Sequence, residues 1–213
     1  WKGVLPPLSD KPLLVFVSHR HEDHFNPAVF ALADRKADIQ FLLGSDFRLT
    51  PHNLTKWQLS PEIAAKCRRC GKHGTFTPLP GVTVETFPST DEGVAWMVTV
   101  EGQSIFHAGD LNWWHWAEED LAWNRNMEAN FKRYTEPLRG RRVDLAMLPL
   151  DSRLKTDGYL GPNYFLNLME VRRFLPMHQW EDFAFTDEFL SAYPQFAPIT
   201  VKIHRDGEFL GEL

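Results

Sequence analysis

Short apolar runs alternate with amphipathic segments along the whole chain. Runs rich in β-branched and aromatic residues predict strands, and apolar residues spaced three or four apart predict helices. We predict strands over residues 12–18, 39–45, 82–89, 94–100, 104–110 and 143–150, and helices opening at Pro27 and spanning 60–69, 118–138, 162–174 and 186–193. The last residues, from Ile199, predict a hairpin that turns at Asp206 and Gly207. Mixed strands and helices favour an α/β (α+β) fold with helices packed on sheets.

The bulk properties narrow the class of protein. The chain has 213 residues and no repeat or linker-like stretch, so we expect one domain over 1–213. With 43% hydrophobic residues and a net charge of −5, it resembles a globular protein, and nucleic acid is a poor partner. No apolar run approaches the roughly 18 residues that span a bilayer, and no signal segment opens the chain, so we expect no membrane partner and a cytoplasmic location.

The segment VFVSHRHEDHFNP places three histidines, one glutamate and one aspartate within positions 19–24, directly after a predicted strand. His19 and His21 are two residues apart on a loop, so both rings can point to one side. Asp23 and His24 follow the bend and can face a second position nearby. Imidazole nitrogens with carboxylate oxygens suit zinc, manganese or iron better than calcium or magnesium.

Asp110 and His178 occupy equivalent places, because each follows an apolar run that predicts a strand. Strand ends are where sites gather in layered α/β folds. A solvated turn would explain one lone histidine, but four potential ligands in six positions would each need a separate reason. The pattern therefore predicts a metal site.

These motifs also carry a resemblance. SHRHEDH resembles the SHxHxDH signature of the metallo-β-lactamase-fold hydrolases, and FHAGD and PMH are similar to later motifs of that family, in the same order. Further likeness is to an uncharacterised bacterial branch near ascorbate-6-phosphate lactonase-like proteins. The resemblance extends over residues 1–207 and implies a four-layer αββα sandwich with the site at one edge of two sheets. It also implies an opening hairpin longer than these first residues, so the N-terminal hairpin is expected to be incomplete.

The resemblance further implies an enzyme, a metal-dependent hydrolase with one or two divalent ions, zinc first and manganese or iron as alternatives. A water between two ions would lose a proton and attack an ester, lactone, amide or phosphoester of a small-molecule substrate. Asp23 would orient this water and collect a proton. The implied ligands are His19 and His21 for the first ion, Asp23, His24 and His178 for the second, and Asp110 bridging both.

One departure from the family pattern concerns the first ion. The family supplies a third histidine from the loop before the strand at 94–100, and this chain has PSTDEGVAW there, with no histidine between His73 and His107. Asp91 or Glu92 would replace it, and we favour Asp91. An oxygen ligand favours manganese or iron over zinc. A mononuclear or non-catalytic member that acts as a binding or scaffold module is the alternative function.

Other residues have a functional and a structural interpretation. In NWWHW, Trp113 would wall a substrate pocket and His115 would donate a proton, or both would simply pack on the following helix. Arg153 would bind an anionic substrate group and Asp151 would hold a histidine ligand from behind, or the two would form a surface ion pair.

Cys67 and Cys70 form a single CxxC. They would be half of a separate zinc site that needs further ligands, although two reduced thiols explain them better. Nothing in the sequence sets the oligomeric state, and a homo-oligomer stays open.

Overall fold

The computed structural model describes residues 7–211, and its strands form two sheets. The small sheet is parallel, in the order β1 (Leu13–Val17), β2 (Ile39–Leu43), β3 (Cys67–Arg69). The large sheet has the order β4 (Gly74–Leu79), β5 (Val82–Pro88), β6 (Val94–Val100), β7 (Gln103–His107), β8 (Arg142–Pro149), β9 (Glu170–Met177). Its pairs are antiparallel from β4 to β7 and parallel from β7 to β9.

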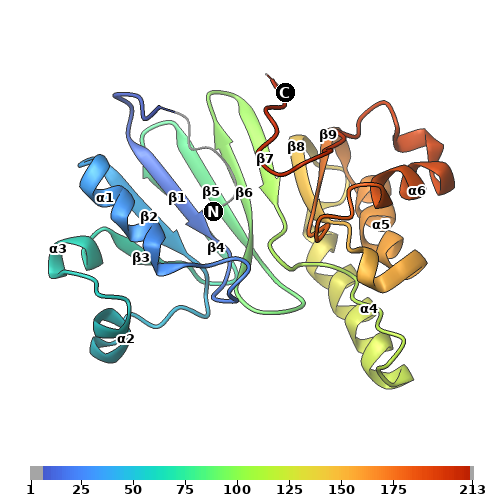
Figure 1. Ribbon diagram of the computed structural model, residues 1–213, viewed down its shortest axis with the longest axis horizontal. Helices are drawn as coiled ribbons and strands as arrows, with labels where there is room; N and C mark the ends of the chain where they lie inside the picture. The colour runs from blue at the N-terminus through green and yellow to red at the C-terminus, as the bar shows by residue number, and fades with distance from the viewer. Residues whose placement is uncertain (1–6, 212–213) are drawn as a thin grey trace.

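Helices lie on the outer side of each sheet (Figure 1). The small sheet carries η1 (Pro27–Ala31), α1 (Leu32–Arg35), α2 (Pro51–Lys56) and α3 (Pro61–Ala64). The large sheet carries α4 (Leu121–Thr135), α5 (Leu160–Leu168) and α6 (Phe185–Ala192), with the short turns η2 (Glu136–Leu138), η3 (Ser152–Tyr159) and η4 (Pro194–Phe196). Among residues 7–211, none of the helices has the length and apolar character that crossing a membrane requires.

The alternation of side chains in β1 explains the layers. Val15 and Val17 pack in the cluster on the helical side of the small sheet, and Phe16 packs in the cluster between the sheets with Val84 and Trp96. Successive side chains of a strand point to opposite faces, so an apolar strand buries both. A third cluster joins the large sheet to its helices. The predicted αββα order is therefore confirmed.

Two predicted helices are too long at their C-terminal ends. The segment predicted as helix over 60–69 becomes α3 and then β3, which pairs with Phe41–Leu43 of β2. The helix predicted to reach Phe174 ends at Leu168, and β9 follows from Glu170. Pairing along β8 fixes β9 as a strand, an interaction between distant segments that local periodicity does not register.

Other features differ from the sequence prediction. β4 and α2 were not predicted, and β4 is an irregular strand with Pro78 within it. The predicted C-terminal hairpin is wrong over the described residues: a turn lies at 205–207, but no strand forms within 201–211. Instead Thr200 makes a single parallel bridge with Phe174. Any hairpin formed by the first residues lies largely outside the described part, which begins at residue 7.

Three glycines surround Ser18, where the chain leaves β1, and we call them the Ser18 collar. A Cβ at Gly44 or at Gly93 would lie 1.9 Å from the Ser18 carbonyl oxygen, and one at Gly109 would lie 2.7 Å from the Ser18 Cβ. The same carbonyl accepts a hydrogen bond from the backbone N–H of Val94 (3.1 Å). The collar thus fixes the direction in which residues 19–24, which we call the histidine loop, leave β1.

The collar predicts the effect of two matched substitutions. Gly93→Ala adds a clash with Ser18 to the cost of φ +70°, whereas Gly81→Ala keeps φ +80° with no atom within 4 Å. We expect Gly81→Ala to lower the free energy of unfolding by about 1 kcal/mol and Gly93→Ala by about 3 kcal/mol or more. Urea denaturation of both variants measures this, and equal losses would refute the close approach at Ser18.

Candidate metal centre

Side chains that can ligate a metal gather in two neighbouring groups, each with its ligand atoms within 4.8 Å of one another. They come from the loop after β1, the loop between β5 and β6, and the residues after β7 and β9. The first group is His19, His21, Asp91 and Asp110, and the second is Asp23, His24 and His178. All seven residues predicted as ligands are thus brought together, although they span most of the chain.

Asp110 lies where the two groups meet. Its Oδ2 is 3.3 Å from His19 Nε2, while its Oδ1 is 3.1 Å from His24 Nε2 and 3.6 Å from His178 Nε2. The Asp110 side chain is only 6% exposed. One carboxylate oxygen therefore faces each group, which is the arrangement that a bridging ligand requires.

The buried atoms of this cluster fit a metal ion. His19 Nε2, His24 Nε2, His178 Nε2 and Asp110 Oδ1 are all buried and make no hydrogen bond with the protein. Buried polar atoms nearly always have a partner, so four convergent exceptions need an explanation. A divalent ion satisfies such nitrogen and oxygen lone pairs together, and these residues fit one.

The charges of the cluster also favour a cation. Burial raises the pKa of the Asp110 carboxyl, but contacts with His19 and His24 outweigh it and hold the pKa far below its ordinary value. Asp110 therefore stays ionised. Burial lowers the pKa of His24, and the nearby carboxylates of Asp110 and Asp23 more than reverse this, so the net pKa is raised. Protons thus compete with a metal for His24 as the pH falls.

Hydrogen bonds behind two histidines set their orientation. His19 Nδ1 is 3.1 Å from Ser18 Oγ, and His178 Nδ1 is 2.8 Å from Asp151 Oδ2. Burial raises the pKa of Asp151, but the bonds from His178 and Arg153 lower it to about 2, so Asp151 is a carboxylate. Such partners fix the ring so that Nε2 points at the metal position.

The backbone after β9 is strained. His178, Trp180 and Glu181 have φ values of 65°, 50° and 67°, a left-handed conformation that costs non-glycine residues free energy. The bend turns the His178 ring toward Asp23, whose Oδ2 is 3.3 Å from His178 Nε2. Nothing in the local sequence predicts this bend.

The loop between β5 and β6 bears on the missing third histidine. Asp91 Oδ2 is 3.4 Å from His21 Nδ1, whereas Glu92 Oε2 is 4.0 Å from His21 Nε2 and 3.8 Å from Arg20. Asp91, and not Glu92, joins the first group. Sequence reasoning missed Asp46, which accepts hydrogen bonds from the Arg20 backbone (2.9 Å) and side chain (3.1 Å) and holds the histidine loop. Its position just after a strand was the available signal.

A cavity of about 650 Å³ opens beside the ligands. It is lined by His21, Glu22, Asp23, Asp91, Asp110, Trp114, Trp116, Trp123, Met127, Arg153, His178 and Trp180. Arg153 lines the cavity, and it forms an ion pair with Asp151, which does not line it. The lining does not include Trp113 or His115.

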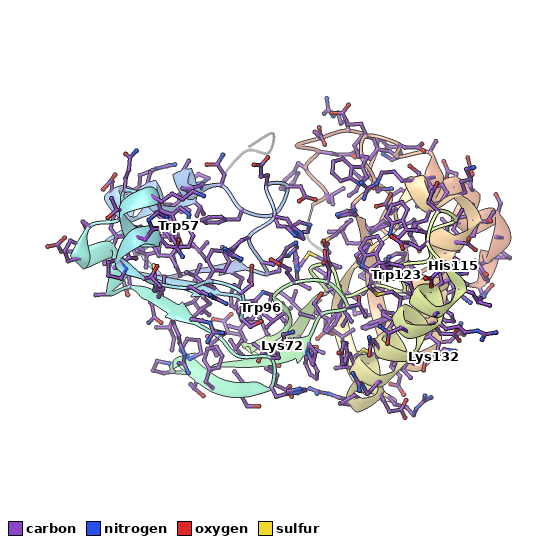
Figure 2. All side chains as sticks on the ribbon, turned by 90° about the horizontal axis from the view of Figure 1, so that it is seen from below. Trp57, Lys72, Trp96, His115, Trp123 and Lys132 are labelled. Atoms are coloured by element: carbon purple, nitrogen blue, oxygen red, sulfur yellow. The ribbon has the colours of Figure 1, made fainter. Side chains whose placement is uncertain are left out.

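Trp113 belongs to the helical layer, contrary to its predicted place in a pocket wall. Its ring packs against Phe131 and Tyr164, and the Nζ of Lys132 is 4.5 Å from its centroid. Lys132 lies on α4 (Figure 2). The neighbouring Trp114 and Trp116 line the cavity instead. His115, predicted as a proton donor, is placed outside the cavity lining together with Trp113.

No protein-family model matches the chain. The structure is similar to CmlA, a diiron β-hydroxylase from Streptomyces venezuelae, with a TM-score of 0.62 at 9% identity, over 92% of this chain and 44% of that one. It is also similar to the metallo-β-lactamase fold protein YhfI from Bacillus subtilis, with a TM-score of 0.53 at 11% identity, over 84% of this chain and 70% of that one.

The chain has the metallo-β-lactamase fold. An isothiocyanate hydrolase from Delia radicum gut bacteria aligns with a TM-score of 0.53 at 13% identity, over 92% of this chain and 74% of that one. In sequence, the chain is 26% identical over 181 residues to a UPF0173 metal-dependent hydrolase of Nitratidesulfovibrio vulgaris, strain Hildenborough. That match covers 82% of this chain and 65% of the relative, so the chain spans slightly less than two thirds of the length of the curated relative.

Within this metallo-β-lactamase fold, the two cysteines lie apart from the metal centre. Cys67 packs on the helical side of the small sheet and Cys70 between the sheets. Burial raises the pKa of both thiols to about 11. Over residues 7–211 neither cysteine joins a group of potential ligands, so the structure gives no support to a separate zinc site there.

His107 lies near the ligands but is not one of them. Burial lowers its pKa to about 4, and its Nδ1 accepts a hydrogen bond from the backbone N–H of Gly109 (3.0 Å).

Asp151 is expected to strengthen metal binding through His178. Asp151→Asn replaces the charged acceptor of His178 Nδ1 and should weaken metal binding by about 10- to 100-fold, measured by chelator competition. Asp144→Asn is the matched control, because Asp144 also lies on the β8 side and accepts hydrogen bonds, but from Ser104 away from the cavity. Equal metal affinity in the two variants would contradict a role for Asp151.

The two acidic residues before β6 are expected to differ. Asp91→Ala should lower the affinity for one of two ions, because it removes the oxygen ligand beside His21. Glu92→Ala should leave both affinities unchanged, because that carboxylate faces Arg20. Calorimetric titration of metal-free protein with Zn²⁺ and with Mn²⁺ measures both variants. A larger loss in Glu92→Ala would reverse the assignment.

Proposed function

We propose that this protein is a metal-dependent hydrolase that binds two divalent ions, one in each ligand group, and uses water to cleave an ester, lactone, amide or phosphoester bond of a small molecule. The observation that carries the proposal is the convergence of three buried histidine nitrogens, none of which makes a hydrogen bond with the protein, on the shared Asp110 carboxylate. The 26% identical metal-dependent hydrolase supports the same class of activity.

When bound, paired divalent ions would polarise a substrate oxygen and lower the pKa of a bound water toward neutrality. The protein's own side chains hold and orient the reactants. Asp23 lines the cavity, and its carboxylate is 36% exposed, with Oδ2 3.4 Å from His24 Nε2. It is therefore placed to orient the attacking water and to accept its proton, in addition to ligating the second ion.

The choice of metal follows from the donors. Histidine nitrogens dominate the buried part of the site and suit zinc, while the oxygen of Asp91 in the first group allows manganese or iron. The first group contains the two most exposed of the seven ligands, since the side chains of His21 and Asp91 are 45% and 40% exposed. This exposure is the observation that favours the second candidate, a member with one ion that binds a partner without catalysis.

A small molecule is the substrate class that the cavity favours. Its volume of about 650 Å³ matches the usual size of small-ligand sites. Glu22, Asp23 and Asp91 line it, and these carboxylates would repel a phosphate backbone. We therefore propose no nucleic-acid substrate.

Metal content of a set of variants tests the proposal. Protein reconstituted with Zn²⁺ and freed of excess should hold about two ions per chain by elemental analysis. His21→Ala and His178→Ala should each lose one ion, and Asp110→Ala should lose both, because it serves both groups. His52→Ala is the control, since His52 lies exposed on α2 away from the ligands.

Activity is measured on the same proteins with a panel of generic esters, lactones and phosphodiesters. Hydrolysis should fall at least about 10²-fold in all three ligand variants and stay unchanged in the control. A wild-type protein that binds one ion and, like every variant, hydrolyses no member of the panel would favour the non-catalytic alternative. A protein that binds no ion would refute both.

A further inference from the structure

The apolar part of the cavity lining beside the ligands is mostly aromatic, and we call it the aromatic wall. Four tryptophans and a methionine contribute to it: Trp114, Trp116, Trp123, Met127 and Trp180. Trp180 is 49% exposed, which is unusual for a side chain with so large an apolar surface. Trp123 lies in the first turn of α4, in the opposite half of the molecule from Trp57 (Figure 2). Exposed indole faces in a cavity suit a planar apolar part of a ligand.

Arg153 lies beside this aromatic wall in a fixed orientation. Its guanidinium carbon is 4.4 Å from the Trp180 ring centroid and 5.4 Å from that of Trp116. Its Nε and Nη2 donate to Asp151. Within residues 7–211, no hydrogen bond involves Nη1. One edge of the guanidinium is therefore occupied, and the remaining donors are available to a ligand.

This arrangement suits a carboxylate on the ligand. A guanidinium held in place loses little freedom when it binds a second planar anion, and its fork matches the two oxygens of a carboxylate. Arg153 is the one arginine or lysine among the described residues that line the cavity. Glu22, Asp23 and Asp91 carry negative charge elsewhere in the lining. A negatively charged ligand group is thus directed to Arg153.

The position of Arg153 separates that group from the reacting bond. Asp151 binds Arg153 and also His178 Nδ1. The opposite ring nitrogen, His178 Nε2, faces Asp23 and Asp110. Along this chain of contacts, a carboxylate and the width of an imidazole ring separate the guanidinium from the ligand atoms. An anion on Arg153 is a recognition group of the substrate and not the group that reacts.

We propose that the substrate is a small ester, amide or lactone that carries a carboxylate remote from the scissile bond and a planar apolar ring between them. The carboxylate binds Arg153, and the ring packs against Trp116 and Trp180. Calling this ligand a substrate rests on the proposed hydrolase function. Binding of the ligand at this site can be tested without catalysis.

The test is calorimetric binding of 3-phenylpropionate to metal-free protein, where no ion can hold the carboxylate. The matched probes are 3-phenylpropionamide, which keeps the ring and loses the charge, and acetate, which keeps the charge and loses the ring. We expect 3-phenylpropionate to bind at least about tenfold more tightly than either probe. Equal binding of the amide and the carboxylate would overturn the proposal.

Variants connect the binding to named residues. Arg153→Gln should weaken 3-phenylpropionate binding at least about tenfold. Arg133→Gln, an exposed arginine on α4 that contacts Asn130 and Tyr134, should leave it unchanged. Trp116→Leu should weaken 3-phenylpropionate binding, and Trp116→Phe should retain most of it. Trp180→Leu alters an exposed side chain, so it reports on the aromatic wall even if Arg153→Gln fails to fold.

Zinc content, measured on the same variants, separates recognition from support of the metal site. We expect Arg153→Gln to retain the wild-type zinc content. If it loses zinc and still binds the probe as the wild type does, Arg153 only positions Asp151 and the proposal is wrong. Binding that needs zinc and ignores Arg153 and both tryptophans would overturn it as well, with the hydrolase function intact. Binding as expected in a protein without hydrolytic activity would refute the hydrolase function and leave the carboxylate site standing.

Discussion

The carboxylate of Asp110 is the interaction on which the arrangement of the site depends. Three histidines approach its two oxygens, and they reach it from the ends of two different strands, β1 and β9. These strands belong to different sheets, so the site forms only when the two sheets pack in one position relative to each other. The cluster of Phe16, Val84 and Trp96 between the sheets fixes that relative position, because it is closely packed and apolar. The Ser18 collar then sets where the histidine loop leaves it.

The ligands could be predicted from sequence because their signal is local or repeated. The histidine loop concentrates four donors after one strand, and Asp110 and His178 follow apolar runs in the same way. The residue pattern predicted helices packed on sheets, and the αββα layer order came from the resemblance to the metallo-β-lactamase-fold hydrolases. For two positions the sequence left alternatives open, and the structure gives the contacts: Asp151 with His178, and Asp91 with His21.

The features that sequence reasoning missed depend on long-range contacts. β3 and β9 each follow a helix directly, and only their pairing with β2 and β8 ends the helical pattern. In NWWHW, composition alone does not indicate which indole faces the cavity. Trp114 and Trp116 line the cavity, while Trp113 packs on α4. The left-handed bend at His178 has no sequence signature, because His178 is neither glycine nor asparagine.

The split of the ligands between the two sheets has a consequence for the life of the protein in the cell. His19 and His24 follow the small sheet, while Asp110 and His178 follow the large one. An ion that binds these residues only in the folded chain stabilises the folded state by mass action. It would also hold the two sheets together, because its ligands come from both of them. Loss of the metal would then leave the interface between the sheets more accessible to proteases. The abundance of such a protein would then follow the metal supply.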